Sequence, residues 1–289
     1  MKSIKLFLLF SVFLLTMNAC TEYVETGNNL VEWVNPLMGT QSKHSFSNGN
    51  VYPAIAVPWG MNFWTPQTGR MGNGWIYSYE ADKINGFKQT HQPSPWIGDY
   101  GQFAIMPVTG EPTYNERERA SWFSHKSEVS KPHYYSVYLA DHDVVTEITP
   151  TERAAMFRFT FPENDSSFVV IDALNDSSYV KVIPEEKKVI GYSTKNRGGV
   201  PENFKNYFVV IFDKPFTYSA VFNEQGLDAT QSEVNSEHTG AVIGFKTKRG
   251  DKIHASVASS FISHEQAEIN LRELNGDGFD EVKEKAKAA

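Results

Sequence analysis

The segment of this sequence best suited to chemistry is residues 86–101, which read GFKQTHQPSPWIGDYG. It places His91, Trp96 and Asp99 in a loop interrupted by proline and glycine. An indole ring can cover the apolar C–H face of a pyranose, while a carboxylate and an imidazole bond its hydroxyls. The combination therefore indicates sugar binding. The alternative is that Trp96 fills the core, and that His91 and Asp99 bond the amides of their own loop.

Two further groups of residues are candidates for a binding or structural role. Arg70 and Trp75 lie in a second glycine-rich segment, GRMGNGW, which offers a cation and an indole as a second candidate substrate contact. A structural role is the alternative for both. Glu147 and Arg153 bracket a Thr-Pro-Thr turn, and we expect them to form a structural salt bridge across it.

Catalytic and metal-binding motifs are missing from the sequence. There is no G-x-S-x-G, no H-E-x-x-H and no phosphate loop, and Cys20 is the only thiol. Hydrolysis of a glycoside generally needs two carboxyl groups on either side of the bond. No acidic pair here has a pocket-like context, and no oxygen ligands have calcium-loop spacing. We therefore assign no catalytic residue and no metal ligand.

The N-terminus has the pattern of an export signal. Lys2 and Lys5 precede an apolar run over residues 6–17, which is too short to span a bilayer but suits a signal peptide. Cys20 follows directly after a small residue, as in a bacterial lipobox, and is the predicted lipidation site. An ordinary secretory signal is the alternative. We expect a signal peptide over 1–20, a tether over 21–30, and an exported Gram-negative lipoprotein, periplasmic or on the cell surface.

The overall charge narrows the range of partners. The chain has 289 residues, a formal net charge of −7 and no basic run. Because such a surface repels phosphate backbones, nucleic acid is excluded as a partner. The lipid at Cys20 is then the only expected contact with a membrane.

The pattern of apolar residues predicts an all-β, mainly antiparallel sandwich followed by one or two C-terminal helices. Short runs of β-branched and aromatic residues alternate with polar ones and are separated by turn clusters. We expect strands at 103–108, 134–139, 144–149, 155–161, 167–173, 180–183, 188–192, 207–212, 217–222, 241–246 and 252–259.

The two predicted helices lie beyond the sandwich. Ser263 and Gln266 form a capping-box pattern for the first, and Asp277 can cap the second. Phe279, Val282 and Ala286 share one face of that second helix. They either pack back on the sandwich or belong to a linker toward another domain, in which case this face lacks a partner here.

A series of short motifs resembles glycoside hydrolase family 92. They are VNPLMGT (34–40), GNVYP (49–53), PWGM (58–61), INGF (84–87), TH (90–91), GDYG (98–101), TEITPTER (146–153), FTFP (159–162) and SFISHEQA (260–267). They follow one another over nearly the whole chain after the signal. After the TH pair, this chain reads QPSPW where many members are richer in glycine and serine, which puts the exact ligand contacts in doubt.

That resemblance implies a fold and an activity. Resemblance to this family implies a calcium-dependent, inverting exo-α-mannosidase. In such an enzyme a β-sandwich (a galactose-mutarotase-like supersandwich) packs against an (α/α)6 barrel. The barrel holds the acid, the base and most calcium contacts, while the sandwich lends loops to the mannose pocket. The resemblance thus implies a sandwich over 31–262, a helical linker over 263–289, and a catalytic domain that is missing or encoded separately. Calcium is implied for the complete enzyme only.

Three hypotheses follow. In the first, the chain is part of an α-mannosidase that acts on mannose-containing glycans, and it is inactive alone. In the second, it is a free-standing lipid-anchored module that binds such glycans. The third is a purely structural surface domain in which every tryptophan is buried. We favour the first.

Overall fold

The computed structural model describes residues 30–41, 45, 51–61, 63–69, 76–91 and 99–289. Cys20, Arg70, Trp75 and Trp96 therefore lie outside the described residues. The short 3-10 helix η1 (Leu30–Trp33) belongs to a small N-terminal unit, and Val34 begins the unit described below. Among the described helices, none combines the length and the apolar character that crossing a membrane requires.

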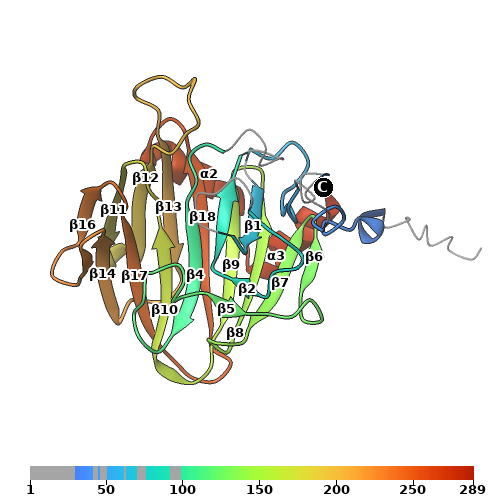
Figure 1. The fold of residues 1–289 in the computed structure, drawn as a ribbon, viewed down its shortest axis with the longest axis horizontal. Coiled ribbons are helices and arrows are strands. Elements are labelled where there is room, and N and C mark those ends of the chain that lie inside the picture. The colour runs from blue at the N-terminus through green and yellow to red at the C-terminus, as the bar shows by residue number, and fades with distance from the viewer. Residues whose placement is uncertain (1–29, 42–44, 46–50, 62, 70–75, 92–98) are drawn as a thin grey trace, which may run out of the picture. The chain divides into compact units, whose positions relative to one another are not determined.

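Two antiparallel sheets face each other and form a β-sandwich (Figure 1). In the described part of the chain, one sheet has seven strands in the order β1 (Phe63–Gln67), β3 (Gly86–Thr90), β4 (Ala104–Thr109), β10 (Asn164–Asp172), β17 (Gly240–Thr247), β14 (Tyr218–Asn223) and β15 (Gly226–Asp228). The other has nine, in the order β16 (Glu233–Ser236), β11 (Ser178–Ile183), β12 (Lys188–Ser193), β13 (Asn206–Phe212), β18 (Lys252–Ser260), β9 (Ala154–Thr160), β8 (Val144–Pro150), β7 (Tyr134–Leu139) and β6 (Val129–Lys131). A two-stranded ribbon joins β2 (Lys83–Ile84) and β5 (Ser121–Trp122).

Alternation of apolar and polar residues explains the strands that the sequence predicts. In β7, Tyr135, Val137 and Leu139 are buried, while the residues between them are more exposed. Every predicted strand has a counterpart in the structure, and the all-β sandwich is confirmed. The strand predictions omit Gly86–Thr90, which forms β3 and is buried along its whole length.

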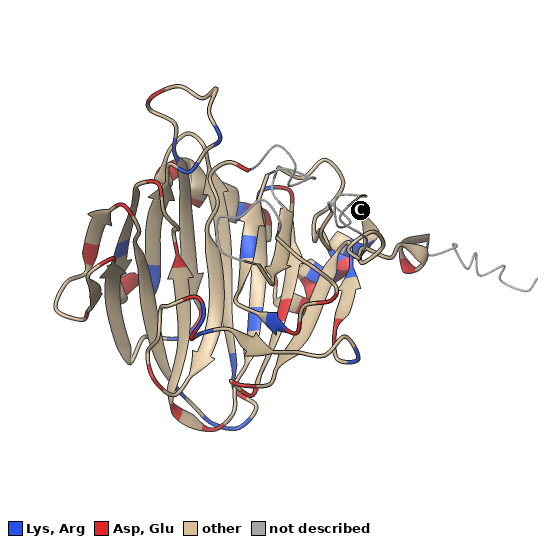
Figure 2. Ribbon diagram, in the orientation of Figure 1, with Lys and Arg blue, Asp and Glu red and all other residues tan. Residues whose placement is uncertain are grey.

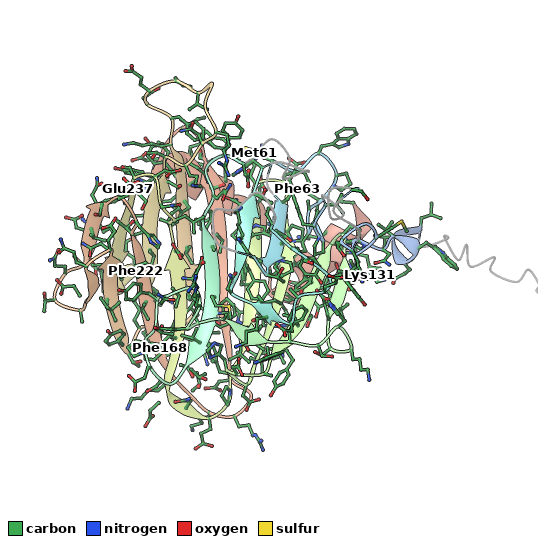
Figure 3. The ribbon with its side chains drawn as sticks, viewed as in Figure 1. Met61, Phe63, Lys131, Phe168, Phe222 and Glu237 are labelled. Carbon is green, nitrogen blue, oxygen red and sulfur yellow. The ribbon has the colours of Figure 1, made fainter. Side chains whose placement is uncertain are left out.

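The main core fills the space between the two sheets with large aromatic side chains. The Trp64 ring meets the edges of Phe103 and Phe157, at centroid distances of 5.4 and 4.8 Å, and Phe103 stacks on Phe208. Phe168 and Phe222, from the seven-stranded sheet, extend the same core (Figure 3). Burial of a side chain as large as Trp64 contributes about 3 kcal/mol to stability.

A smaller core lies between the nine-stranded sheet and the C-terminal helices. Helix α2 (His264–Leu271) contacts β18 and β13, and α3 (Phe279–Ala288) contacts β8 and β9. Ser263 caps α2 by accepting a hydrogen bond from the Gln266 amide, as predicted. Gly278, not Asp277, is the residue that caps α3, and its amide donates to Glu281. The part of the chain described here also contains two short 3-10 turns, η4 (Pro184–Glu186) and η5 (Arg272–Leu274).

The apolar face of α3 has a partner within this chain. Phe279 and Val282 are buried against Ala154, Met156 and Ala258 of the sheet. The expectation that this face lacks a partner is therefore wrong, and the helix packs back on the sandwich.

Candidate functional site

The predicted site lies where β3 ends and the chain returns toward β4. Phe63 of β1 is paired with Thr90 at this end of the sandwich, and Met61 lies beside it (Figure 3). His91 and Asp99 face each other across this return, because Oδ1 of Asp99 accepts a hydrogen bond of 2.9 Å from the His91 amide. The same oxygen accepts 2.8 Å from the Tyr100 amide. Asp99 thus bonds the amides of its own loop, as the alternative interpretation predicts.

The geometry around His91 determines which ring nitrogen carries the proton. Nδ1 lies 2.7 Å from the carbonyl oxygen of Tyr100, which can only accept, so Nδ1 donates. Burial lowers the pKa of His91, although the Asp99 carboxylate and the Tyr100 carbonyl act in the opposite direction. The ring is therefore neutral at pH 7, and Nε2 has a free lone pair. Among the described residues this buried Nε2 has no hydrogen-bond partner.

Lys88 is a site residue that sequence reasoning missed. It is fully buried in β3, and its Nζ lies 3.9 Å from Oδ2 of Asp99. Burial lowers the pKa of Lys88 to about 8, and the Asp99 charge limits the fall. Neither Nζ nor Oδ2 has a hydrogen-bond partner among the described residues. A buried cation, a carboxylate and an imidazole with unused bonding capacity suit polar ligand groups such as hydroxyls.

Gly101 closes the site on the side of the nine-stranded sheet. Its φ of +59° is in the left-handed region, and its amide donates to the Lys195 carbonyl at 2.7 Å. A Cβ at this position would lie 2.3 Å from Cβ of Asn206. This close approach explains why the GDYG motif ends in glycine.

The structure describes the residues on either side of the segment that holds Arg70 and Trp75. The amides of Thr68 and Gly69 donate to the Ile76 carbonyl at 3.0 and 3.3 Å, and the Ser78 amide donates to Thr68 Oγ1. The chain therefore enters and leaves this segment at one point.

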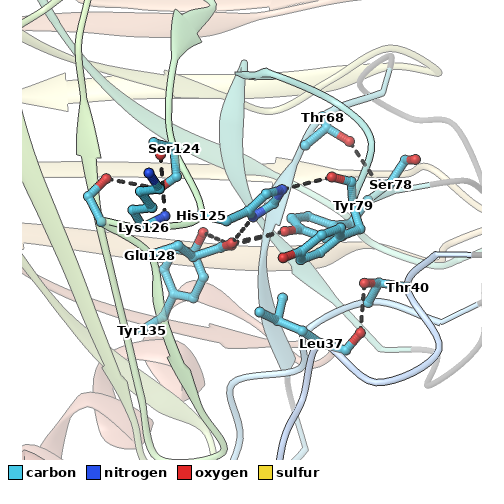
Figure 4. Close-up of polar contacts among 12 residues, drawn as sticks. Leu37, Thr40, Thr68, Ser78, Tyr79, Ser124, His125, Lys126, Glu128 and Tyr135 are labelled. Carbon is cyan, nitrogen blue, oxygen red and sulfur yellow. Dashed lines mark hydrogen bonds and ion pairs between the residues drawn. The ribbon is translucent and has the colours of Figure 1, made fainter.

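A buried carboxylate fixes the described residues after this segment. Glu128 accepts hydrogen bonds from Tyr135 at 2.6 Å and from Tyr77 at 3.1 Å. His125 lies 2.5 Å from the same carboxylate and stacks on Tyr79, whose carbonyl its Nε2 contacts (Figure 4). Nothing in the sequence singles out Glu128, because its partners come from three separate segments.

An exposed apolar surface borders the site. Phe261 packs on the His91 ring at 4.9 Å, and the next residue, Ile262, is 74% exposed. Ile269 of α2 is 45% exposed, and with Met61 these residues line one shallow groove. Trp59 is 98% exposed in a neighbouring groove beside α3. The hypothesis that every tryptophan is buried is therefore wrong.

The predicted salt bridge between Glu147 and Arg153 does not form. Glu147 is directly opposite Arg158 in the β8–β9 ladder and bonds it at 2.6 Å, while Arg153 pairs with Glu273 beyond α2. Glu273 thus attaches the C-terminal helices to the turn between β8 and β9.

Among the described residues, no three His, Cys, Asp or Glu side chains come together as a metal-binding cluster. Acidic and basic residues are interspersed over the described ribbon (Figure 2), and no basic face appears in it.

Comparison with known proteins places the whole sandwich in one family. Residues 33–260 match the family described as Glycosyl hydrolase family 92 N-terminal domain. A solved family 92 inverting mannosidase from Bacteroides thetaiotaomicron is 45% identical, with a TM-score of 0.85 over 89% of this chain. A second α-mannosidase from that organism, solved with mannoimidazole, is 31% identical with a TM-score of 0.79 over 90% of this chain.

The chain spans only part of each relative. It covers 35% and 36% of the two solved mannosidases. An uncharacterized secreted glycosidase of Arthroderma benhamiae is 23% identical over 145 residues, which is 48% of this chain and 18% of that protein.

Proposed function

This chain belongs to glycosyl hydrolase family 92 through the N-terminal domain of that family, and on this premise we propose that it forms one wall of a mannoside pocket. The complete enzyme would be an exported, calcium-dependent, inverting exo-α-mannosidase that acts on mannose-containing glycans. In this proposal Cys20 bears the lipid anchor. Arg70, Trp75 and Trp96 contribute further contacts from outside the described residues.

The observation that supports this most strongly is the free bonding capacity at His91. Its Nε2 is a buried acceptor, and Lys88 Nζ is a buried donor close enough to influence the pKa of the ring. Leaving such groups unpaired costs about 1–3 kcal/mol each, and a bound hydroxyl would recover part of it. We assign the sugar hydroxyls to these two side chains, with Asp99 fixing their positions.

The second wall of the pocket, the acid, the base and the calcium contacts would come from a catalytic domain. The solved relatives are nearly three times as long as the part that this chain matches. The exposed surface of Phe261, Ile262 and Ile269 borders His91 and is apolar enough to pack against such a domain.

A free-standing glycan-binding module is the second candidate. The packing of α3 on its own sheet favours it, because the apolar face of this helix needs no other domain for its burial. This candidate predicts measurable mannoside affinity in the chain alone, without hydrolysis.

Assaying the chain on an α-mannoside with calcium, alone and joined to the rest of a family 92 enzyme, separates these proposals. We expect hydrolysis only in the joined protein. Robust turnover by the chain alone contradicts the assignment of the acid and base to another domain. Mannoside affinity without turnover in either form favours the binding module.

A further inference from the structure

A line of buried hydrogen bonds crosses the sandwich and connects α2 with the His91–Asp99 site. Asn270 of α2 donates to the Ser259 carbonyl at 2.8 Å, and the Ser259 hydroxyl accepts from Gln89 Nε2 at 2.9 Å. Gln89 Oε1 accepts from Asn206 Nδ2 at 3.2 Å, and Asn206 also donates to the Gly101 carbonyl. We call Asn270, Ser259, Gln89, Asn206 and Gly101 the amide relay.

The amide relay connects parts of the fold that are far apart in sequence. Gln89 belongs to β3 of the seven-stranded sheet, whereas Ser259 and Asn206 belong to β18 and β13 of the nine-stranded sheet. β18 continues past its last pair with β9, Ala154–Ala258, while Ser259 and Ser260 still pair with β13, and α2 attaches at this end. The side chains of Gln89 and Asn206 are fully buried, so water does not compete for their hydrogen bonds.

Both arms of the site are attached to this relay. Gln89 lies in β3 two residues before His91, which follows the end of the strand, and Gly101 follows Asp99 by two residues. The hydrogen bond from Asn206 to Gln89, together with the one to Gly101, therefore fixes the distance between the two arms. That distance sets the contact between the His91 amide and Asp99.

We propose that Gln89 and Asn206 are positioning residues that transmit the docking of α2 to His91 and Asp99. Neither residue needs to touch the ligand. A substitution in α2 at Asn270 then loosens the site, although Asn270 contacts neither His91 nor Asp99. The effect on sugar affinity rests on the proposed function, while the effect on the site itself does not.

Hydrogen exchange of the full chain, read at the His91 and Tyr100 amides, tests the relay directly. Both amides donate to Asp99, and the Val170 amide in the central strand β10 reports global opening. We expect Gln89→Met, which keeps the volume and removes both bonds, to accelerate exchange at His91 and Tyr100 about tenfold relative to Val170. Asn270→Leu should accelerate them about threefold, because it removes one bond of the relay at its far end, together with a bond from Gln266 within α2.

Two variants serve as controls. Glu268→Gln weakens another attachment of α2, its ion pair with Lys188, without touching the relay, and should leave both site amides unchanged. Gln89→Glu, as the neutral acid that full burial favours, keeps a carbonyl acceptor for Asn206 and gains a hydroxyl that can donate to Ser259. It should therefore restore most of the protection lost in Gln89→Met.

Equal acceleration at Val170 and at the site amides, or an effect of Glu268→Gln as large as that of Asn270→Leu, overturns the proposal. If Gln89→Met does not fold, the comparison of the two α2 variants decides alone. A titration with methyl α-mannoside accompanies each variant. Absence of affinity in the unsubstituted chain would count against the proposed function and leave the exchange result standing.

Discussion

Arg158 and Glu147 form a bidentate pair across the β8–β9 ladder, with Nε and Nη2 donating at 2.6 and 2.7 Å to the two carboxylate oxygens. The remaining Nη1 reaches Asp280 in α3 at 3.0 Å, and the guanidinium lies over the Phe279 ring. The pair therefore attaches the last helix to the sheet. Sequence reasoning placed Glu147 with Arg153 instead, because the register that sets it opposite Arg158 is not visible in the sequence.

Replacing this arginine tests how firmly α3 is held. Arg158→Met leaves the largely buried Glu147 carboxylate without its cation, so we expect the free energy of unfolding to fall by about 3 kcal/mol. Urea denaturation measures it. Lys246→Met, which removes an exposed ion pair with Asp165, is the control and should change stability by less than about 0.5 kcal/mol. Equal losses of unfolding free energy in the two variants would contradict a stabilising role of the Arg158 network.

Gly101 and Gly110 provide a matched pair of substitutions. Both have positive φ, but a Cβ at Gly101 meets Asn206 at 2.3 Å, whereas a Cβ at Gly110 meets nothing within 4 Å. Gly110→Ala should therefore cost about 1 kcal/mol of backbone strain. Gly101→Ala should cost at least about 2 kcal/mol more, because Asn206 must move as well. Similar melting temperatures for the two variants would contradict the close approach at Gly101.

His238 should stabilise the fold at low pH. Burial by itself would lower the pKa of His238, but its 2.7 Å hydrogen bond to the buried Asp172 carboxylate outweighs it and raises the pKa. Because the folded pKa lies above the unfolded one, the contribution is complete below about pH 6.5 and is lost as pH rises through the folded value. The stability difference between the native protein and His238→Gln, measured from pH 5 to 9, should shrink with rising pH.

His142 should show the opposite trend. Its Nε2 donates to the Arg119 carbonyl at 2.8 Å and its Nδ1 accepts from the Thr109 amide, an arrangement that requires the neutral ring. Burial lowers the pKa of His142 despite the Arg119 carbonyl. The stability it provides is therefore present above about pH 6.5 and is lost as pH falls toward the folded value. A His142→Gln variant whose stability deficit grows on acidification would contradict this assignment.

Lys88 offers a test that separates function from stability. Because burial lowers its pKa to about 8, Lys88 is still mainly protonated at pH 7, and holding this charge in the buried site costs stability. Lys88→Met should therefore not reduce the free energy of unfolding, yet it should weaken mannoside binding about tenfold by removing a donor. Thermal denaturation and a mannoside titration of the same variant measure the two effects. A destabilised variant with unchanged affinity would assign Lys88 a purely structural role.

The sequence predicts the sandwich well where one face of a strand is apolar. The bounds of β7 are found from the alternation of Tyr135, Val137 and Leu139 alone. Strand β3 is missed because Lys88, Gln89 and Thr90 are polar and nevertheless buried, which only the tertiary partners Asp99, Ser259 and Asn206 make possible. Of the candidate site residues, the structure brings His91 and Asp99 together, and that contact links two motifs of the family.

The central claim is that the surface around His91 and Asp99 faces a mannose residue, and an NMR titration of this chain with methyl α-mannoside tests it most directly. We predict that the amide resonances of His91, Tyr100 and Gly101 shift with a common, weak affinity, and that His91→Ala abolishes the shifts. Saturable shifts that cluster elsewhere, for example around the exposed Trp122, while the three site amides stay unchanged, would contradict the account.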